Sequence, residues 1–218
     1  MPPEITEPTR IIAIRHGETA WNVDTRIQGQ LDIGLNGAGR WQAHRLAMAL
    51  AGESIDAIYS SDLLRAWDTA MSVAGAVGRE VQTDEGLRER GFGVFEGKTF
   101  QQIADLWPDQ SLLWRKRDPV FAPQGGESLV DFRQRVTSAV ARLAAPHQGQ
   151  QIVLVAHGGV MDVLYRAATR QEIQAPRTWD LGNAAINRLL WTPEGLSIVG
   201  WADTHHLDDD ETLDESTV

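Results

Sequence analysis

Two short apolar segments of this chain end in the same dipeptide, His-Gly. Residues 11–17 read Ile-Ile-Ala-Ile-Arg-His-Gly, and residues 152–158 read Ile-Val-Leu-Val-Ala-His-Gly. Continuous apolar runs of this kind are typical of parallel strands that are buried on both faces. Ligands of open α/β sheets bind beyond the carboxyl ends of the strands, so neighbouring strands of this type would bring two imidazoles together where such folds do chemistry.

Strands alternate with helical stretches along the rest of the chain, which indicates a three-layer α/β/α architecture with a mostly parallel central sheet. A turn at 192–195 joins the last two strands into an antiparallel hairpin at the sheet edge. We expect a flexible arm over 1–9, a single domain over 10–206 and an acidic, disordered tail over 207–218. The predicted strands are 10–15, 55–59, 80–83, 152–156, 186–191 and 196–201; the predicted helices are 36–51, 63–77, 99–107, 109–117, 127–145 and 159–169.

Composition limits the function classes. The chain has 218 residues and no cysteine, which excludes disulfides, thiolate catalysis and thiolate metal sites, and suits a reducing compartment. It has no apolar run of membrane-spanning length and no signal-peptide pattern at its start, so a cytoplasmic protein without membrane contact is expected. The net charge is −10, with six acids and no base in the tail. This balance argues against nucleic-acid binding, and an anionic substrate would need a locally basic pocket.

His16 is the first candidate for chemistry because Arg15 precedes it at the end of a buried strand. A charged side chain there is costly unless it has an anionic partner, and the arginine fork suits phosphate. Neighbouring cations disfavour protonation of His16, and a neutral imidazole is what nucleophilic attack requires. The alternative is a hydrogen-bonded structural histidine.

Four further residues have a functional and a purely structural reading. His157 and Gly158 open a helix whose N-terminus could bind an anion, or they form a simple strand-to-helix turn. Arg65 lies one turn into the helix after the capping residues 60–62 and could offer a second fork to an oxyanion, or be a surface arginine. A carboxyl at Glu89 beside a phosphate could act as general acid for the leaving oxygen, or belong to a solvated charge cluster. No histidine spacing indicates a metal site.

Together these segments resemble the histidine phosphatase superfamily, also called the phosphoglycerate-mutase-like proteins. The resemblance runs in order from about residue 10 to 191. Its first block begins with Arg15-His16-Gly17-Glu18-Thr19, followed by Trp21-Asn22, Gln28-Gly29 and Leu35-Asn36. Its later blocks are Ser60-Ser61-Asp62-Leu63-Leu64-Arg65, Leu87-Arg88-Glu89, Gly125-Gly126-Glu127-Ser128 and Val155-x-His157-Gly158-Gly159.

The resemblance implies a phosphoglycerate mutase-like fold and a metal-independent phosphoryl transfer. By it His16 becomes a phosphohistidine and Glu89 protonates the leaving group. His157 also belongs to the catalytic set, as a hydrogen-bond donor in its neutral or protonated form. The implied contacts to the phosphoryl group or its surroundings are Arg15, Asn22, Gln28, Gly29, Arg65 and the backbone amide of Gly158.

Two departures from the mutases of this family favour a phosphatase acting on a small phosphorylated metabolite without a cofactor. The segment 97–126 is shorter than in the mutases, and Gly159 stands where they tend to have asparagine. Arg115 and Lys116 favour a mutase, since they could bind a second anionic group of the substrate. A solvated helix end explains these two residues as well. The alternatives are a phosphoglycerate mutase, which would use 2,3-bisphosphoglycerate as cofactor, and a phospho-ligand-binding module without turnover. A homodimer through an edge strand is compatible with the pattern.

Overall fold

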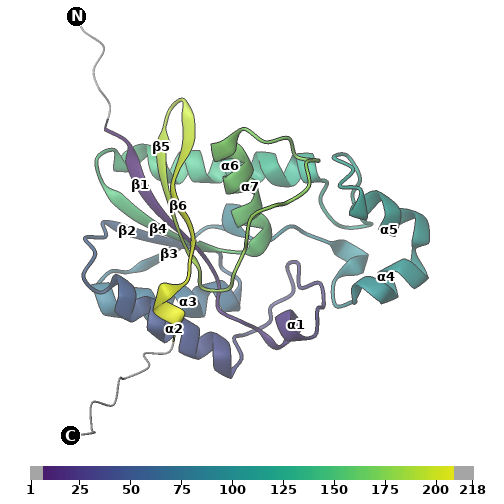
Figure 1. Cartoon of the computed structure of the whole chain (residues 1–218), viewed down its shortest axis with the longest axis horizontal. Helices are drawn as coiled ribbons and strands as arrows, with labels where there is room; N and C mark the ends of the chain where they lie inside the picture. Colours follow the sequence, from purple (N-terminus) through teal and green to yellow (C-terminus); the bar gives the residue numbers. More distant parts are fainter. Residues whose placement is uncertain (1–6, 209–218) are drawn as a thin grey trace, which may run out of the picture.

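A six-stranded sheet forms the centre of the computed structural model, which describes residues 7–208. The first four strands in spatial order are parallel, and the last two run antiparallel to their neighbours. This confirms the predicted α/β class and the hairpin at the sheet edge (Figure 1). In spatial order the strands are β3 (Val81–Thr83), β2 (Ala57–Ser60), β4 (Gln151–Ala156), β1 (Thr9–Arg15), β5 (Ile186–Thr192) and β6 (Gly195–Asp203).

The two His-Gly strands are direct neighbours. β1 and β4 pair in parallel, with Arg15 opposite Ala156 in the register. The backbone N–H of His16 donates to the carbonyl of Ala156 at 3.0 Å, which extends the pairing one residue past the strand. Both histidines therefore leave the sheet at the same height, as the repeated segment predicts.

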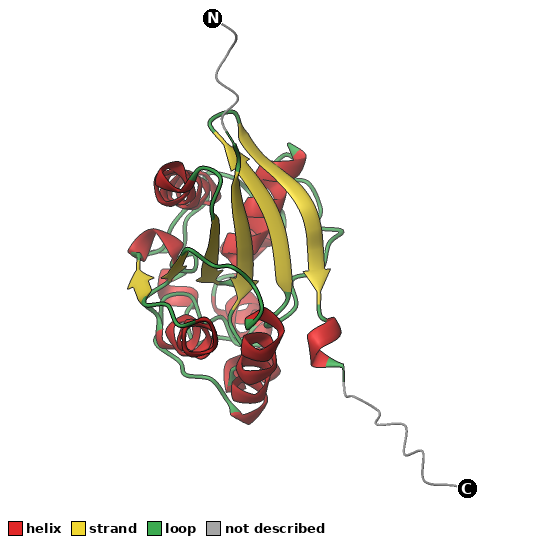
Figure 2. Ribbon diagram, turned by 90° about the vertical axis from the view of Figure 1, so that its left-hand side faces the viewer, coloured by secondary structure: helices red, strands yellow, loops and turns green. Residues whose placement is uncertain are grey.

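Helices cover both faces of the sheet (Figure 2). Ile12 and Ile14 pack in the cluster that includes α2 and α3, whereas Ile11 and Ala13 pack in the cluster that includes α6 and α7. Because strand side chains alternate between faces, Arg15 leaves β1 toward α7 and His16 leaves toward α3. The four helices are α2 (Gly37–Leu50), α3 (Leu64–Val77), α6 (Leu129–Ala144) and α7 (Gly158–Thr169).

Two short helices, α4 (Phe100–Leu106) and α5 (Pro108–Arg115), form a cap that projects past the carboxyl edge of the sheet, near α1 (Ala20–Val23) (Figure 1). Phe95 is fully buried beneath the cap, with its ring centroid 5.5 Å from that of Trp107 and 5.6 Å from that of Trp114. Aromatic packing thus fixes the cap beside the functional edge. The 3₁₀ turns are η1 (Glu85–Leu87), η2 (Gly93–Phe95), η3 (Ala145–His147) and η4 (His205–Leu207).

The ends of the domain differ slightly from the prediction. Thr9, expected in the arm, belongs to β1, because its buried hydroxyl donates to the carbonyl of Ala144 at 2.9 Å. Leu207, expected in the tail, ends η4, and the carbonyl of Asp208 accepts a hydrogen bond from Arg45. The other residues predicted for the tail, and residues 1–6 of the arm, lie outside the described residues.

Two further expectations concern surfaces. No helix within residues 7–208 is long and apolar enough to cross a membrane. β6 is an edge strand, with Val199 61% exposed, but the proposed homodimer through such an edge stays a prediction.

Candidate active site

The backbone around His16 is fixed from several directions. The side chain of Asn183 donates to the carbonyl of His16 at 2.9 Å, and Gly17 N–H donates to the Thr69 hydroxyl at 3.1 Å. A Cβ at Gly17 would stand 2.5 Å from the carbonyl oxygen of Gly39, so only glycine allows α2 to approach this closely. His16 is consequently held in one place at the end of β1.

Hydrogen bonding defines the tautomer of His16. Its Nδ1 lies 2.7 Å from the carbonyl oxygen of Gly17, which can only accept, so Nδ1 carries the proton. In the neutral ring Nε2 then holds the lone pair, and Arg65 Nε donates toward it across 3.3 Å. Nε2 is therefore the nucleophilic atom, and a cationic donor stands beside it.

Arg65 is almost completely buried, and its fork is already occupied. Nη1 donates to the carbonyl of Leu31 at 2.8 Å and Nη2 to that of Gly29 at 2.7 Å. Burial lowers the pKa of Arg65 to about 10, so the guanidinium stays charged at neutral pH. The two carbonyls take the fork and Nε faces His16, so the predicted contact of Arg65 with an oxyanion stays a prediction.

His157 lies beside His16, with ring centroids 5.2 Å apart in an edge arrangement. Its Nε2 is 2.8 Å from the Ser61 hydroxyl, which also accepts from Leu63 N–H at 3.3 Å. The hydroxyl proton is thus free to donate to Nε2, which favours the proton of a neutral His157 on Nδ1. Ser61, predicted to cap α3, instead orients His157; the N-cap of α3 is Leu63, without a side-chain cap bond.

Two buried nitrogens at this edge have no hydrogen-bond partner among the described residues: Arg15 Nε and His157 Nδ1. A Cβ built on Gly158 would lie 3.4 Å from Arg15 Nε, so a larger residue would enter the same space. The opposite end of the Arg15 guanidinium is anchored on the carbonyl of Leu181. Unsatisfied buried donors are costly, and two of them beside a nucleophile indicate a site for an anion.

Glu89 faces this site from the loop between η1 and η2. Its Oε1 accepts from the N–H of Arg90 at 2.8 Å, and its Oε2 accepts from the N–H of Gly159 at 3.0 Å. A Cβ on Gly159 would stand 2.1 Å from Oε1, so glycine is needed for this approach to the α7 N-terminus. Each carboxyl oxygen keeps a second lone pair, which leaves room for one proton to be carried and transferred.

Both histidines are neutral in this environment. Burial lowers the pKa of His16 well below 6.5, and the positive charges of Arg65 and Arg15 lower it further. Burial also lowers the pKa of His157 well below 6.5, with the same arginines adding to the effect. The structure thus favours the neutral form of His157.

Protonation of the two buried histidines is expected to destabilise the fold in acid. In the unfolded chain their pKa is about 6.5, so below that pH the unfolded state binds protons that the folded state does not. The free energy of unfolding keeps their full contribution above about pH 6.5 and falls below it, by up to about 1.4 kcal/mol per pH unit for each histidine. Urea unfolding of the wild type and of His157→Gln at pH 7 and pH 5 measures this contribution.

The variant should lose less stability between the two pH values than the wild type. His205→Gln is the matched control. The Asp203 carboxylate raises the pKa of this exposed histidine, so its protonation favours the folded state, and its removal should not reduce the loss of stability at pH 5. Equal losses in the wild type and in His157→Gln would show that His157 is not buried in its neutral form.

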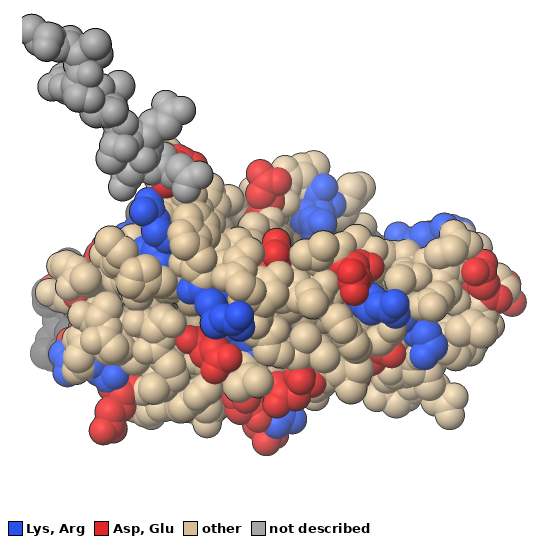
Figure 3. Space-filling view, turned by 90° about the horizontal axis from the view of Figure 1, so that it is seen from below, with Lys and Arg blue, Asp and Glu red and all other residues tan. Residues whose placement is uncertain are grey.

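A pocket of about 750 Å³ opens from this edge toward the cap. Acidic and basic side chains are interspersed on the surface seen in Figure 3, but the pocket is strongly basic. This arrangement meets the requirement that an anionic ligand on an acidic protein needs local positive charge. The charged lining residues are Arg15, Arg26, Arg65, Arg90, Arg115, Arg117, Arg133, Arg166, Arg177, Glu89 and Asp162.

Some of these arginines are structural. Asp162 Oδ2 accepts from Arg117 at 2.9 Å and from Arg166 at 3.0 Å, and Arg117 also donates to the carbonyl of Ile173. These bonds tie the end of α5 to α7 and to the loop before β5. By contrast, the side chains of Arg133 and Arg177 make no hydrogen bond or ion pair within residues 7–208 and are exposed at the pocket rim.

The remaining predicted site residues divide into two groups. Gln28 and Gly29 line the pocket, and Gln28 Oε1 is buried without a partner among the described residues. Asn22 does not line it: its Oδ1 accepts from the backbone and hydroxyl of Thr19 in a capping box. Of the two second-anion candidates, Arg115 lines the pocket and Lys116 does not, because α5 ends at Arg115.

Sequence reasoning missed several residues that shape this site. Ser61 and Asn183 position the histidines, and Arg133 and Arg177 add charge at the rim. Of these residues only Ser61 could have been found from the sequence, because it belongs to one of the segments that carry the family resemblance, residues 60–65. Among residues 7–208 no group of three or more His, Asp or Glu side chains is arranged to hold a metal ion.

Comparisons with known proteins agree with this geometry. The model of the histidine phosphatase superfamily, branch 1, matches residues 11–204. Phosphoglycerate mutase-like protein 4 of Arabidopsis thaliana is 39% identical over 94% of this chain and 90% of its own length. Metal-independent phosphoserine phosphatase of the same plant is 36% identical over 93% and 84%. Glucosyl-3-phosphoglycerate phosphatase of Mycobacterium tuberculosis is 40% identical over 84% and 87%.

Solved structures give the same picture. A mutant phosphoserine phosphatase from Entamoeba histolytica in complex with phosphoserine is 30% identical, covers 92% of this chain and 100% of its own, and has a TM-score of 0.82. Mycobacterial glucosyl-3-phosphoglycerate phosphatase in complex with VO3 is 37% identical, covers 89% and 99%, and has a TM-score of 0.78. Mutase names also occur among the relatives, at 33% identity for a Yersinia enterocolitica protein named "Probable phosphoglycerate mutase".

Proposed function

The chain belongs to the histidine phosphatase superfamily, and on that premise we propose that it hydrolyses phosphomonoesters of small metabolites through a phosphohistidine at His16. One observation carries the proposal: His16, with its lone pair on Nε2, lines the pocket close to the donors Arg15 Nε and His157 Nδ1, which have no partner among the described residues. A phosphoryl group at that edge would give both donors their missing acceptor.

In the first step His16 Nε2 attacks phosphorus. The Nε2–P bond forms while the bond from phosphorus to the ester oxygen breaks, and protonated Glu89 transfers its proton to that oxygen as the alcohol leaves. Arg15, Arg65 and His157 surround the equatorial oxygens with donors and positive charge. Phosphoryl transfer depends mainly on such positioning and charge stabilisation, so the chain's own residues supply what the step requires.

In the second step water attacks the phosphohistidine. The Glu89 carboxylate accepts the proton of the attacking water, the new P–O bond forms, and the Nε2–P bond breaks. The lone pair returns to Nε2 of a neutral His16, and inorganic phosphate leaves. Glu89 thus acts as acid in the first step and base in the second, which places it ready for the next turnover.

Hydrolysis is favoured over mutase chemistry by the site and by the phosphatase names among the relatives. The phosphatase-named relatives cited above are 36% and 40% identical, a mutase-like protein is 39% identical and a probable mutase is 33% identical, so the identities alone do not separate the two activities. Gly159 lets the Glu89 carboxylate reach the α7 N-terminus, where a Cβ would stand 2.1 Å from Oε1, and this approach keeps the proposed acid and base beside the phosphoryl site. A phosphoglycerate mutase remains the second candidate because Arg115 lines the pocket.

The basic rim supports a substrate that carries a second anionic group. Arg133 and Arg177 stand on opposite segments of the rim, one on α6 and one on the loop before β5, with no acidic partner among the described residues. A carboxylate held there would use the arginine fork that suits it. Structures of an Entamoeba histolytica relative in complex with phosphoserine and with 3-phosphoglyceric acid support carboxylated phosphomonoesters as the first class to test.

Phosphate release should be measured with phosphoserine and 3-phosphoglycerate, and with glycerol phosphate as a comparison substrate that has no carboxylate. We expect turnover of all three, and Arg177→Ala should raise KM for the carboxylated substrates by about tenfold while changing KM for glycerol phosphate much less. Adding 2,3-bisphosphoglycerate to 3-phosphoglycerate tests the alternative. Rapid formation of 2-phosphoglycerate without net phosphate release would establish the mutase, and binding without turnover of any ester would establish a binding module.

Three broader expectations complete the proposal. The activity resides in one domain over residues 10–206, which the family match over 11–204 supports. A cytoplasmic location is supported by the absence of cysteine from the sequence. No metal is required, because arginine side chains provide the positive charge around the phosphoryl group.

A further inference from the structure

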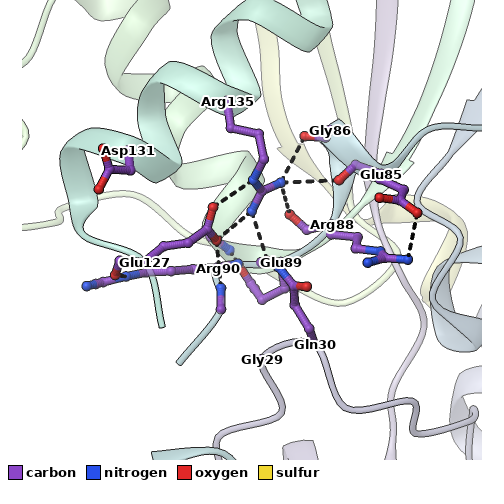
Figure 4. A network of polar contacts seen from close by, with 12 residues as sticks. Gly29, Gln30, Glu85, Gly86, Arg88, Glu89, Arg90, Glu127, Asp131 and Arg135 are labelled. Carbon is purple, nitrogen blue, oxygen red and sulfur yellow. Dashed lines mark hydrogen bonds and ion pairs between the residues drawn. The ribbon is translucent and has the colours of Figure 1, made fainter. Parts of the chain in front are cut away.

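Behind Glu89, four backbone carbonyls of one loop converge on a single guanidinium (Figure 4). Arg135, on α6, donates from Nη1 to the carbonyls of Glu85, Gly86 and Arg88 at 3.4, 3.1 and 3.0 Å. Its Nη2 donates to the carbonyl of Glu89 at 3.1 Å. Three of these contacts are partly buried, and one side chain supplies the partners for most of the segment that carries the proposed general acid.

Glu127 completes the arrangement from the segment before α6. Its carboxylate pairs with Arg135 in bidentate fashion, Oε1 with Nε at 2.8 Å and Oε2 with Nη2 at 2.7 Å. Oε2 also accepts from the N–H of Gly91 at 2.7 Å. The pair therefore holds the loop at the carbonyl of residue 89 and again at the N–H two residues later, on both sides of the Glu89 side chain.

Neither member of the pair lines the pocket. Phe132 does line it, and the Arg135 guanidinium lies 5.1 Å from its ring centroid. A direct contact of Arg135 or Glu127 with a substrate is therefore not part of the geometry. Their hydrogen bonds reach the site through the loop they hold, and Arg135 also adds a positive charge that lowers the pKa of His157.

We propose that Arg135 and Glu127 are positioning residues, which hold the 85–91 loop so that the Glu89 carboxyl stays in reach of the leaving-group oxygen. The inference rests on the proposed function, since it concerns the proton transfer of that reaction. Only a planar fork of donors can serve several carbonyls and a bidentate carboxylate at once, so lysine cannot replace Arg135. A shift of the acid by about 1 Å is enough to cost on the order of 100-fold in rate.

The test uses the chemistry of the leaving group. An alkyl phosphate such as phosphoserine needs a proton on its leaving oxygen, whereas p-nitrophenolate leaves as a stable anion. Arg135→Lys, which keeps the charge but loses the fork, should lower the single-turnover rate of phosphoenzyme formation from phosphoserine by about 10- to 100-fold and that from p-nitrophenyl phosphate by no more than about threefold. Glu127→Gln should show the same selective loss, and it keeps the test open if Arg135→Lys does not fold.

Arg142→Gln is the matched control. Arg142 lies two turns further along α6 and pairs with Asp84, just before the same loop, at 2.8 Å, but it touches none of the carbonyls that Arg135 holds. It should leave both rates unchanged. The inhibition constant for phosphate should be unchanged in every variant, because the phosphoryl site itself is intact.

The outcomes separate this inference from the proposed function. Equal losses in the rate of phosphoenzyme formation from both substrates in Arg135→Lys and Glu127→Gln would show a general structural role and overturn the inference. Unchanged activity in both variants would overturn it as well. Wild-type turnover that does not depend on His16 would instead remove the proposed function, and that is measured before the loop variants are compared.

Discussion

Replacing His16 with alanine is expected to reduce phosphatase activity by at least about 10⁴-fold. The loss follows because Nε2 of this ring, which holds the lone pair at the pocket edge, is the proposed nucleophile. The donors that bind the phosphoryl group remain in the variant, so phosphate should still bind. Steady-state hydrolysis of phosphoserine and p-nitrophenyl phosphate, with phosphate inhibition constants, measures both effects.

His44→Ala is the control for this substitution. His44 is an exposed histidine on α2, and its removal should leave turnover unchanged. Both leaving groups should be affected alike in His16→Ala, because the nucleophile is needed whatever leaves. Activity within about tenfold of the wild type in His16→Ala would contradict the assignment of the nucleophile.

Glu89→Gln should produce the second largest effect, and a selective one. Glutamine keeps the size of the side chain and one acceptor oxygen, but it carries no transferable proton. We expect kcat for phosphoserine to fall by about 10²- to 10⁴-fold, while the formation of phosphoenzyme from p-nitrophenyl phosphate falls far less. Single-turnover kinetics with each substrate separates this first step from the later attack of water.

The hydrolysis of the phosphoenzyme should also slow in Glu89→Gln, because Glu89 is the proposed base for water. Phosphoenzyme formed from p-nitrophenyl phosphate should therefore accumulate in this variant. Glu85→Gln is the matched control, since Glu85 lies on the same loop, is exposed and pairs only with Arg88 at 3.2 Å. An equal fall in the rate of phosphoenzyme formation from both substrates would assign the role of acid to another group. A phosphoenzyme that does not accumulate would assign the role of base to another group.

The positions of both histidines could be predicted because they depend on local pattern. A buried strand alternates its side chains, and Arg15 and His16 continue that alternation past the end of β1 toward α7 and α3. The pairing of β1 with β4 was only a condition of the prediction, and the structure meets it, which brings His157 next to His16. The fold class and the direction of each side chain thus followed from local pattern, whereas the neighbourhood of the two strands did not.

The partners of these residues could not be predicted, because they come from distant parts of the chain. Ser61 and Asn183 reach the histidines only after the sheet has formed, and nothing in the local sequence marks them as partners. Arg65 shows an intermediate case. Its place near the site follows from the helix after β2. The carbonyls that occupy its fork, however, belong to Leu31 and Gly29, which lie 34 and 36 residues earlier in the chain.

The rim was the least predictable part. Arg115 and Lys116 were equivalent as a charge cluster, but α5 ends between them, so only Arg115 turns toward the pocket. Arg177 lies in a loop without helical or strand pattern, and its place at the rim depends on the bond between Arg117 and the carbonyl of Ile173. Specificity in this protein therefore rests on tertiary contacts rather than on any motif.

The central claim is the covalent intermediate on His16, and rapid-quench labelling tests it most directly. Enzyme mixed with phosphoserine labelled in its phosphoryl group should be quenched in alkali within a turnover and digested. We expect acid-labile, alkali-stable label on the peptide that contains His16, absent from His16→Ala, and decaying at a rate no slower than kcat. Label on the peptide that contains His157, or burst-free turnover with no labelled peptide, would contradict the account.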